Sequence, residues 1–241
     1  MQSEKLKGHI DGNSSGAGRP PAVLTDFDDT AAVQNVAELL LNQFGDPTWQ
    51  ELRRQFRAGQ LTLMGYQEVT FRNIQADRAE MQAYVKEHAT LRPHFKELWD
   101  HCQTHQVPLA IVSHGLDFYI EALLEKEGLP QIPVYAVHTS FASQGITYEY
   151  RYACPGQEHL GNSKALVVEW FQQQGYHVTY VGDGRSDFPP ASKADLVFAH
   201  SVLAEECGRQ QVPFHQFRDF GDVLLALRDY EGNGHRREAR P

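Results

Sequence analysis

The sequence predicts an α/β protein in which a parallel sheet is covered by helices on both faces. Short apolar runs alternate with amphipathic segments of about ten or more residues, as in successive βαβ units. The run 107–112 is apolar on both faces, which is typical of a central strand in a parallel sheet. No convincing strand occurs from Trp49 to about His88, so this stretch predicts a small insert of two to four helices.

The elements follow in order along the chain. A first buried strand is predicted at Ala22–Leu24, directly before an acidic turn. The other predicted strands are 107–112, 134–137, 146–150, 177–181 and 196–199. Strands 134–137 and 146–150 are expected to form a hairpin. The other predicted helices are 33–44, at the start of the insert, and 92–105, 116–127, 164–174, 201–209 and 220–227 in the core. Asn162 or Ser163 is the expected N-cap of the helix 164–174.

The domain organisation predicted from these elements is one core with one insert. A chain of 241 residues has room for this arrangement. The core is expected at 21–32 and 90–230, with the helical insert at 33–89. The polar segments 1–20 and 231–241 are expected to be flexible tails.

Composition excludes several classes of function. The formal net charge of -9 argues against binding to nucleic acid or to an anionic membrane. The sequence has no run of about 18 apolar residues, so no membrane span is expected. The N-terminal segment lacks the apolar region of a signal peptide. Three widely spaced cysteines, Cys102, Cys154 and Cys207, fit a reducing cytoplasm better than a disulfide framework.

The acidic turn Thr25–Thr30 carries the first chemical signal. Side chains two residues apart share a face of a strand, so Asp26 and Asp28 are expected to converge where the first strand ends. Carboxylates that close repel each other, and Mg²⁺ would relieve the repulsion while leaving room for phosphate oxygens. An ordinary solvated acidic turn is the alternative at this point.

Polar residues also follow the other predicted strands. Ser113 follows the predicted strand 107–112, Lys164 begins a helix, and Asp183 and Asp187 follow the strand 177–181. In open α/β sheets, ligands bind outside the carboxyl ends of the strands, so these groups are expected to meet. Singly, each has an ordinary explanation as a helix-entry residue, a solvated lysine, a strand exit or a helix cap. Their joint occurrence favours a site.

This order of motifs resembles the haloacid dehalogenase superfamily of phosphatases over about residues 21–227. The resemblance implies a Rossmann-like three-layer α/β/α fold with a small helical C1 cap formed by the insert. It also implies a Mg²⁺-dependent phosphoric monoester hydrolase that forms an aspartyl-phosphate on a small phosphorylated metabolite.

The resemblance assigns a role to each motif residue. Asp26 would be the nucleophile and Asp28 the general acid and base. The implied Mg²⁺ site comprises Asp26, Asp28 through its backbone carbonyl, Asp183 and, in support, Asp187. The implied phosphate-binding residues are Ser113, Lys164 and His114, the last of which has the equal alternative of filling the turn.

The substrate depends on the insert. A cap at this position is found in phosphoserine phosphatases, and the segments 33–35 and 113–118 are more similar to 2-hydroxy-3-keto-5-methylthiopentenyl-1-phosphate phosphatases. Asn35 occupies the position where phosphoserine phosphatases carry a glutamate that pairs with the substrate amine. Asn35 lies off the apolar stripe of its helix and is expected to face the site, with Thr30 as a second candidate substrate contact.

An uncharged headgroup is therefore favoured over phosphoserine. Phosphoserine phosphatase, a phosphotransferase or phosphonate-type hydrolase on the same scaffold, and a non-catalytic binding protein are the alternatives. The sequence does not specify an oligomeric state.

Overall fold

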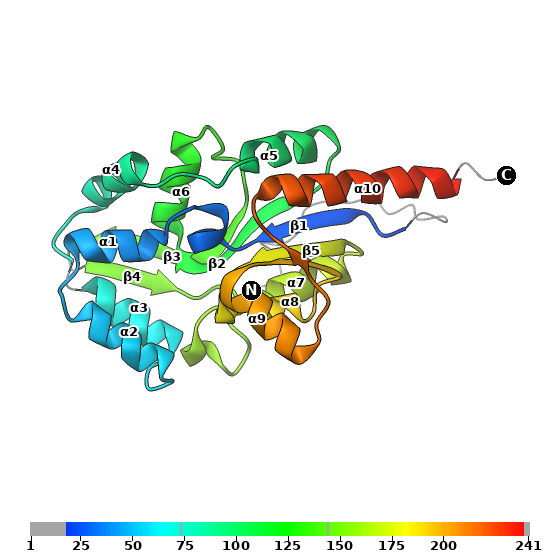
Figure 1. The fold of residues 1–241 in the computed structure, drawn as a ribbon. Coiled ribbons are helices and arrows are strands. Elements are labelled where there is room, and N and C mark those ends of the chain that lie inside the picture. Colours follow the sequence, from blue (N-terminus) through cyan, green and yellow to red (C-terminus); the bar gives the residue numbers. More distant parts are fainter. Residues whose placement is uncertain (1–17, 73, 144, 239–241) are drawn as a thin grey trace.

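A seven-stranded sheet runs through the centre of the computed structural model, which describes residues 18–72, 74–143 and 145–238 (Figure 1). The strand order is β4-β3-β2-β1-β5-β6-β7. The strands span Pro21–Thr25 (β1), Leu109–Leu116 (β2), Val134–Ala142 (β3), Gly145–Glu149 (β4), His177–Gly182 (β5), Leu196–Ala199 (β6) and His215–Gln216 (β7). Every neighbouring pair is parallel except the β3–β4 hairpin, so the carboxyl ends of β1, β2, β5 and β6 share one edge.

Successive side chains of the strands pack alternately into two separate hydrophobic cores. In β1, Val23 packs on one face of the sheet, whereas Ala22 and Leu24 pack on the other, and all three are fully buried. This burial on both faces is typical of a central parallel strand. The expected three-layer α/β/α arrangement is therefore confirmed.

Helices form the two outer layers (Figure 1). Apolar residues of α5 (Phe95–Thr104), α6 (Asp117–Lys126) and α10 (Phe220–Glu238) belong to the core that contains Val23. Those of α7 (Lys164–Gln173), α8 (Phe188–Ala191) and α9 (Ser201–Gln210) belong to the core that contains Leu24.

Four helices occupy the predicted insert: α1 (Val36–Phe44), α2 (Trp49–Arg57), α3 (Leu63–Arg72) and α4 (Arg78–His88). An irregular turn, Phe27–Ala31, connects β1 to this segment. Met81 and Val85 of α4 are fully buried in the same core as α6, so α4 ties the insert to the sheet domain. We call the segment that contains α1–α4 the cap.

The structure differs from the sequence prediction at several elements. Strand β2 does not stop at Val112 but continues to Leu116, after a shift of its register with β3. The short strand β7 has no sequence prediction, because only two residues pair there. The helix predicted at 220–227 is longer than expected, since α10 continues to Glu238, past the residue where the tail is predicted to begin. Glu231 lies 3.0 Å from His101 of α5, which holds this part of α10 against the domain.

The predicted side-chain cap of α7 is wrong. Ser163 is the N-cap residue, but its side chain makes no capping hydrogen bond, and Asn162 Oδ1 instead accepts from the backbone of Tyr152. Residues 1–17 of the predicted N-terminal tail and 239–241 lie outside the described residues. Among the described helices, none is both long and apolar enough to span a membrane.

Candidate active site

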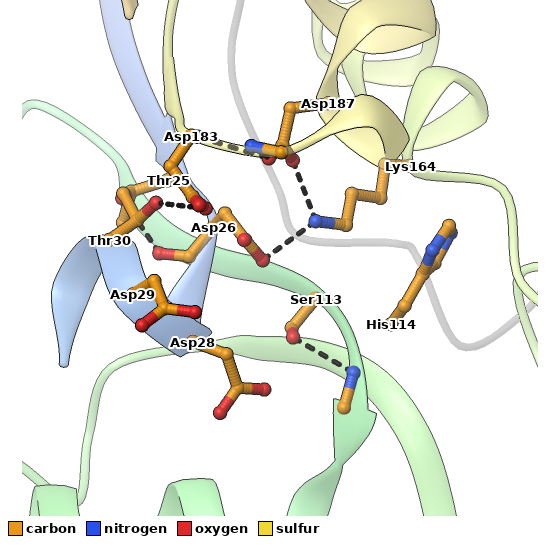
Figure 2. A network of polar contacts seen from close by, with 12 residues as sticks. Thr25, Asp26, Asp28, Asp29, Thr30, Ser113, His114, Lys164, Asp183 and Asp187 are labelled. Atoms are coloured by element: carbon orange, nitrogen blue, oxygen red, sulfur yellow. Dashed lines mark hydrogen bonds and ion pairs between the residues drawn. The ribbon is translucent and has the colours of Figure 1, made fainter. Parts of the chain in front are cut away.

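Polar residues from four segments meet at the carboxyl edge of the sheet (Figure 2). Asp26 directly follows β1, and Asp183 directly follows β5. Ser113 lies within β2, and Lys164 is the first residue of α7. Parallel strands place these ends side by side because β1 pairs with β2 on one side and with β5 on the other. The structure thus brings together the residues that the sequence predicts to meet.

Lys164 lies at the centre of this group. Its ammonium donates to Asp26 Oδ1 over 2.6 Å and to Asp187 Oδ1 over 2.7 Å. The lysine is 4% exposed, so its charge is screened little by solvent. Burial opposes that charge, yet the carboxylates of Asp187 and Asp26 hold the pKa of Lys164 above its usual value. Lys164 is therefore a permanent cation beside Asp26.

Asp187 is fully buried and has both carboxylate oxygens occupied. Oδ1 accepts from Lys164 and from the hydroxyl of Tyr180 at 2.7 Å each, and Oδ2 accepts from the backbone of Asp183 at 3.1 Å and of Gly184 at 2.9 Å. Although burial opposes it, Lys164 holds the pKa of Asp187 below its usual value. Asp187 thus orients Lys164 and the Asp183 backbone, as the sequence predicts for a supporting residue.

Asp183 is the third carboxylate of the group. Its Oδ1 accepts from the hydroxyl of Thr30 over 3.0 Å. Burial, followed by the charges of Asp187 and Asp29, raises the pKa of Asp183 to about 7. Burial and the charge of Asp187 also raise the pKa of Asp26.

The donor set of this group fits a magnesium ion. One carboxylate oxygen from each of Asp26, Asp183 and Asp187 lies within 4.8 Å of the others. Lys164 is the only cation in contact with them among the described ion pairs, so negative charge remains uncompensated. Oxygen ligands at this spacing suit a hard divalent cation, which keeps waters and phosphate oxygens in its remaining positions.

Asp28 does not share the position of Asp26, and the expectation that the two carboxylates converge is wrong. The turn Phe27–Ala31 departs from strand geometry, with φ -66° and ψ 129° at Asp28 and φ 62° at Asp29. Figure 2 shows the Asp28 carboxylate pointing away from the cluster around Lys164. The alternation of side chains that predicts convergence applies to a strand, and β1 ends at Thr25.

Three donors hold the Asp28 carboxylate at the start of the cap. Oδ1 accepts from the backbone of Val36 at 2.7 Å and of Ala37 at 3.3 Å, at the N-terminus of α1. Oδ2 accepts from the hydroxyl of Tyr119 at 3.0 Å. Burial raises the pKa of Asp28 to about 6, although these hydrogen bonds favour the ionised form. A carboxyl with this pKa can both donate and accept a proton near neutral pH.

Gly115 leaves room for this arrangement. A Cβ atom at Gly115 would lie 2.1 Å from the Tyr119 oxygen and 3.1 Å from Asp28 Oδ2. The backbone of Gly115 also donates to Ser113 Oγ over 2.9 Å, and Ser113 is 2% exposed. The glycine of the Ser113–Gly115 segment therefore permits close packing next to the Asp28 carboxylate.

His114 has an unusual environment for a histidine. Burial, together with the charge of Lys164, lowers the pKa of His114 to about 3, so the ring is neutral. The backbone of Asn162 hydrogen-bonds to the ring, while Nε2 is buried without a partner. A neutral ring brings no charge to a phosphate, so contact with substrate stays a prediction beside the alternative that His114 fills the turn.

The two candidate substrate residues face other partners. Thr30 is fully buried and its hydroxyl is committed to Asp183, so it lies behind the site. Asn35 is the N-cap of α1: Oδ1 accepts from the backbone of Glu38 at 3.0 Å and Nδ2 donates to Asp29 Oδ2 at 2.9 Å. The expectation that the Asn35 amide is free to face a substrate is wrong, because capping uses it first.

Several residues of the site have no sequence prediction. The hydroxyls of Tyr119 and Tyr180 donate to the carboxylates of Asp28 and Asp187. Arg92 donates to the backbone carbonyls of Asp29 and Thr30, with 2.7 Å for the second, and so fixes the left-handed backbone at Asp29. Each acts across a long sequence separation, and the sole local signal was the position of Tyr119 just after the Ser113–Gly115 segment.

Comparison with known proteins agrees with this geometry. Residues 23–192 match the model of the haloacid dehalogenase-like hydrolase family. The chain is 26% identical to the 2-hydroxy-3-keto-5-methylthiopentenyl-1-phosphate phosphatase of Brevibacillus brevis over 211 residues, which cover 86% of this chain and 94% of the relative. It is 28% identical to the enzyme of the same name from Geobacillus kaustophilus over 210 residues, with 86% and 94% covered.

Solved structures show the same fold. A substrate-bound phosphoserine phosphatase complex matches with a TM-score of 0.65 at 17% identity, covering 86% of this chain and 98% of that one. A cytosolic 5′-nucleotidase bound to cytidine matches with a TM-score of 0.61 at 14% identity, covering 93% and 89%. At these identities the similarity extends to the fold and not to the substrate.

Proposed function

The chain belongs to the haloacid dehalogenase-like hydrolases, and we propose that it hydrolyses a small phosphate ester with an uncharged leaving group through a phosphorylated Asp26. It is a phosphoric monoester hydrolase, as its relatives are. The observation that carries the proposal is the separation of two carboxylates. Asp26 is held by Lys164, and Asp28 is held apart by Tyr119 and the N-terminus of α1.

The two carboxylates divide the reaction between them. Lys164 engages Asp26 Oδ1, and we assign Oδ2 to the attack on phosphorus. As the new O–P bond forms, the bond to the leaving oxygen breaks, and protonated Asp28 gives its proton to that oxygen. Asp28, now ionised, takes a proton from a water that attacks the aspartyl-phosphate. Inorganic phosphate leaves and Asp26 is regenerated.

Other residues bind and orient the phosphoryl group. Lys164 supplies a buried positive charge, and Ser113 supplies a hydroxyl. Asp26, Asp183 and the Asp28 backbone carbonyl would hold Mg²⁺, which when bound neutralises phosphate charge, with Asp187 in support. Thr30 and Arg92 act indirectly. Thr30 hydrogen-bonds to Asp183, and Arg92 holds the turn that carries Asp28.

The relatives narrow the substrate class. Their name describes a phosphate ester whose leaving group carries hydroxyl and keto groups and a thioether. We propose a substrate of this class, because the His114 ring is neutral and the Asn35 amide is already bonded to Asp29 and to the backbone of Glu38. Neither residue offers a charge to the leaving group. The alternative of a non-catalytic binding protein has less support, because each catalytic position is filled.

Phosphate release tests the proposal directly. Wild-type protein should release phosphate from p-nitrophenyl phosphate with Mg²⁺ and lose this activity with EDTA. Asp26→Asn should reduce the rate by several orders of magnitude, because an amide cannot form the acyl-phosphate. Asp77→Asn, at the exposed N-cap of α4, is a matched control that should keep wild-type activity. A folded Asp26→Asn protein with near-normal turnover would contradict the mechanism.

A further inference from the structure

Gln67 joins the cap to the core next to the site. Gln67 of α3 is 6% exposed, and its Nε2 donates to the backbone carbonyl of His114 in β2. A carbonyl can only accept, so this contact fixes which end of the amide is nitrogen. The other end, Oε1, is buried without a partner. Gln67 therefore presents an acceptor to the interior at the cap–core junction.

Two further buried atoms at this junction lack partners. His114 Nε2 and Asn162 Nδ2 are both unpaired. Because the other ring nitrogen of His114 bonds to the backbone of Asn162, Nε2 of the neutral ring is an acceptor. Asn162 Oδ1 is already committed to the backbone of Tyr152 at 3.0 Å, so its free end is a donor. Gln67, His114 and Asn162 thus offer two unpaired acceptors and one unpaired donor.

Unpaired buried polar atoms need an explanation. Leaving such a group unsatisfied is costly because it has lost its hydrogen bonds to water, and folded proteins retain few of them. These three come from the cap helix α3, from the strand that carries Ser113, and from the loop just before Lys164. His114 directly follows Ser113 in β2, and Asn162 lies two residues before Lys164, so the group borders the proposed phosphate-binding residues. A ligand anchored by its phosphate at Lys164 would extend toward them.

The same junction has an apolar wall. Gly161, the neighbour of Asn162, lies between the cap and the β4 hairpin: a Cβ there would be 3.5 Å from the Tyr150 ring and 3.6 Å from Leu63 of α3. An aromatic ring and a leucine next to unpaired polar atoms suit a leaving group with both a polar and an apolar part.

We propose that Gln67, His114 and Asn162 form the subsite that selects the leaving group of the substrate by hydrogen-bonding its hydroxyl and carbonyl oxygens. This inference rests on the proposed phosphatase function and adds the residues that define the substrate class. A hydroxyl donates to Gln67 or His114, and a carbonyl accepts from Asn162. All three side chains are uncharged, so the subsite takes a neutral hydroxy-keto ester and has no counter-ion for an ammonium or a carboxylate.

Gln67 also joins the cap to the core, and this structural role needs its own control. Gln82 of α4 makes a chemically equivalent contact, with Nε2 donating to the backbone carbonyl of Phe118 at 2.9 Å. No unpaired atom is recorded for Gln82 among the described residues. Gln82→Leu therefore removes a cap–core hydrogen bond of the same kind away from the subsite.

The test compares two esters of equal chain length. Dihydroxyacetone phosphate carries a carbonyl and a hydroxyl, whereas n-propyl phosphate carries neither, and kcat/KM is measured for both with Mg²⁺. Wild-type enzyme should prefer dihydroxyacetone phosphate. Gln67→Leu should lower this preference about tenfold or more, equivalent to one or two hydrogen bonds, with a smaller effect on n-propyl phosphate. Gln82→Leu should leave the preference unchanged.

Asn162→Asp provides a second variant that keeps the fold contact. Aspartate retains Oδ1 for the Tyr152 backbone but replaces the unpaired donor with an acceptor, so the preference should again fall about tenfold or more. If Gln67→Leu and Asn162→Asp slow both esters equally, or if wild type does not distinguish them, the subsite is overturned. If wild type hydrolyses no phosphate ester at all, the proposed function itself fails, which is a distinct result.

Discussion

The hydroxyl of Tyr119 donates a hydrogen bond to Asp28 across 3.0 Å, although the two residues are 91 positions apart in the sequence. Tyr119 is fully buried in α6, and Asp28 lies in the turn that leads into the cap. This contact joins the proposed acid residue to the core, while the backbone of Val36 and Ala37 joins it to the cap. It keeps the carboxyl in one orientation and favours its ionised form.

Tyr119→Phe should therefore alter the pH dependence of the reaction. The change removes a donor that lowers the pKa of Asp28, so this pKa should rise above its value of about 6. Asp28 acts first as an acid, and the alkaline limb of the kcat/KM profile should move upward by about one pH unit, the equivalent of ~1.4 kcal/mol. Tyr84→Phe in α4 should leave the profile in place. A Tyr119→Phe profile that matches wild type would contradict the role of Asp28.

Asp183 should make the stability of metal-free protein depend on pH. Its folded pKa of about 7 lies above the usual aspartate value of about 3.9, because burial disfavours the charge. Its stabilising contribution is complete below about pH 4 and is lost as the pH rises through about 7. Metal-free wild type should lose more thermal stability between pH 5 and pH 8 than Asp183→Asn.

Mg²⁺ should reverse this loss. Binding requires ionised ligands, so Mg²⁺ should raise the melting temperature of wild type more at pH 8 than at pH 5. The increase at pH 8 should largely disappear in Asp183→Asn, as measured by differential scanning calorimetry. An equal increase in both proteins would place the metal elsewhere.

Gly115→Ala should destabilise the protein and slow turnover. The added Cβ would overlap the Tyr119 oxygen, with a separation of 2.1 Å, and would crowd Asp28 Oδ2. Overpacking of this kind typically costs about 1–3 kcal/mol, which urea unfolding can measure. Removing the hydroxyl relieves the overlap, so Gly115→Ala combined with Tyr119→Phe should recover part of the lost stability. Additive losses in the double variant would argue against this contact.

O-phosphoserine should be a poor substrate. Asn35 is neutral and already bonded to Asp29 and Glu38, so it offers no counter-ion to an ammonium. A buried, unpaired charge costs several kcal/mol, and kcat/KM should fall well below that for dihydroxyacetone phosphate. Side-by-side assays check this ratio. A preference for O-phosphoserine would contradict this prediction and favour the phosphoserine phosphatase alternative.

Much of the fold could be predicted from local patterns. Ala22, Val23 and Leu24 are apolar on both faces of a strand, and the structure buries them on both faces. The helical character of the cap, though not its number of helices, follows from a long stretch without a strand signal. The order Asp26, Ser113, Lys164 and Asp183 after successive strands sufficed to predict that they meet, because parallel strands end at one edge.

The sequence by itself determined the α/β class, the position of the cap and the identity of the groups around Lys164, since these depend on periodicity and on the order of motifs. Only the tertiary structure decided where individual side chains point. It turned Asp28 toward Tyr119 and α1, used Asn35 as a helix cap, and placed Gln67 of the cap beside His114. Contacts across tens of residues depend on how elements pack, and local patterns do not encode that packing.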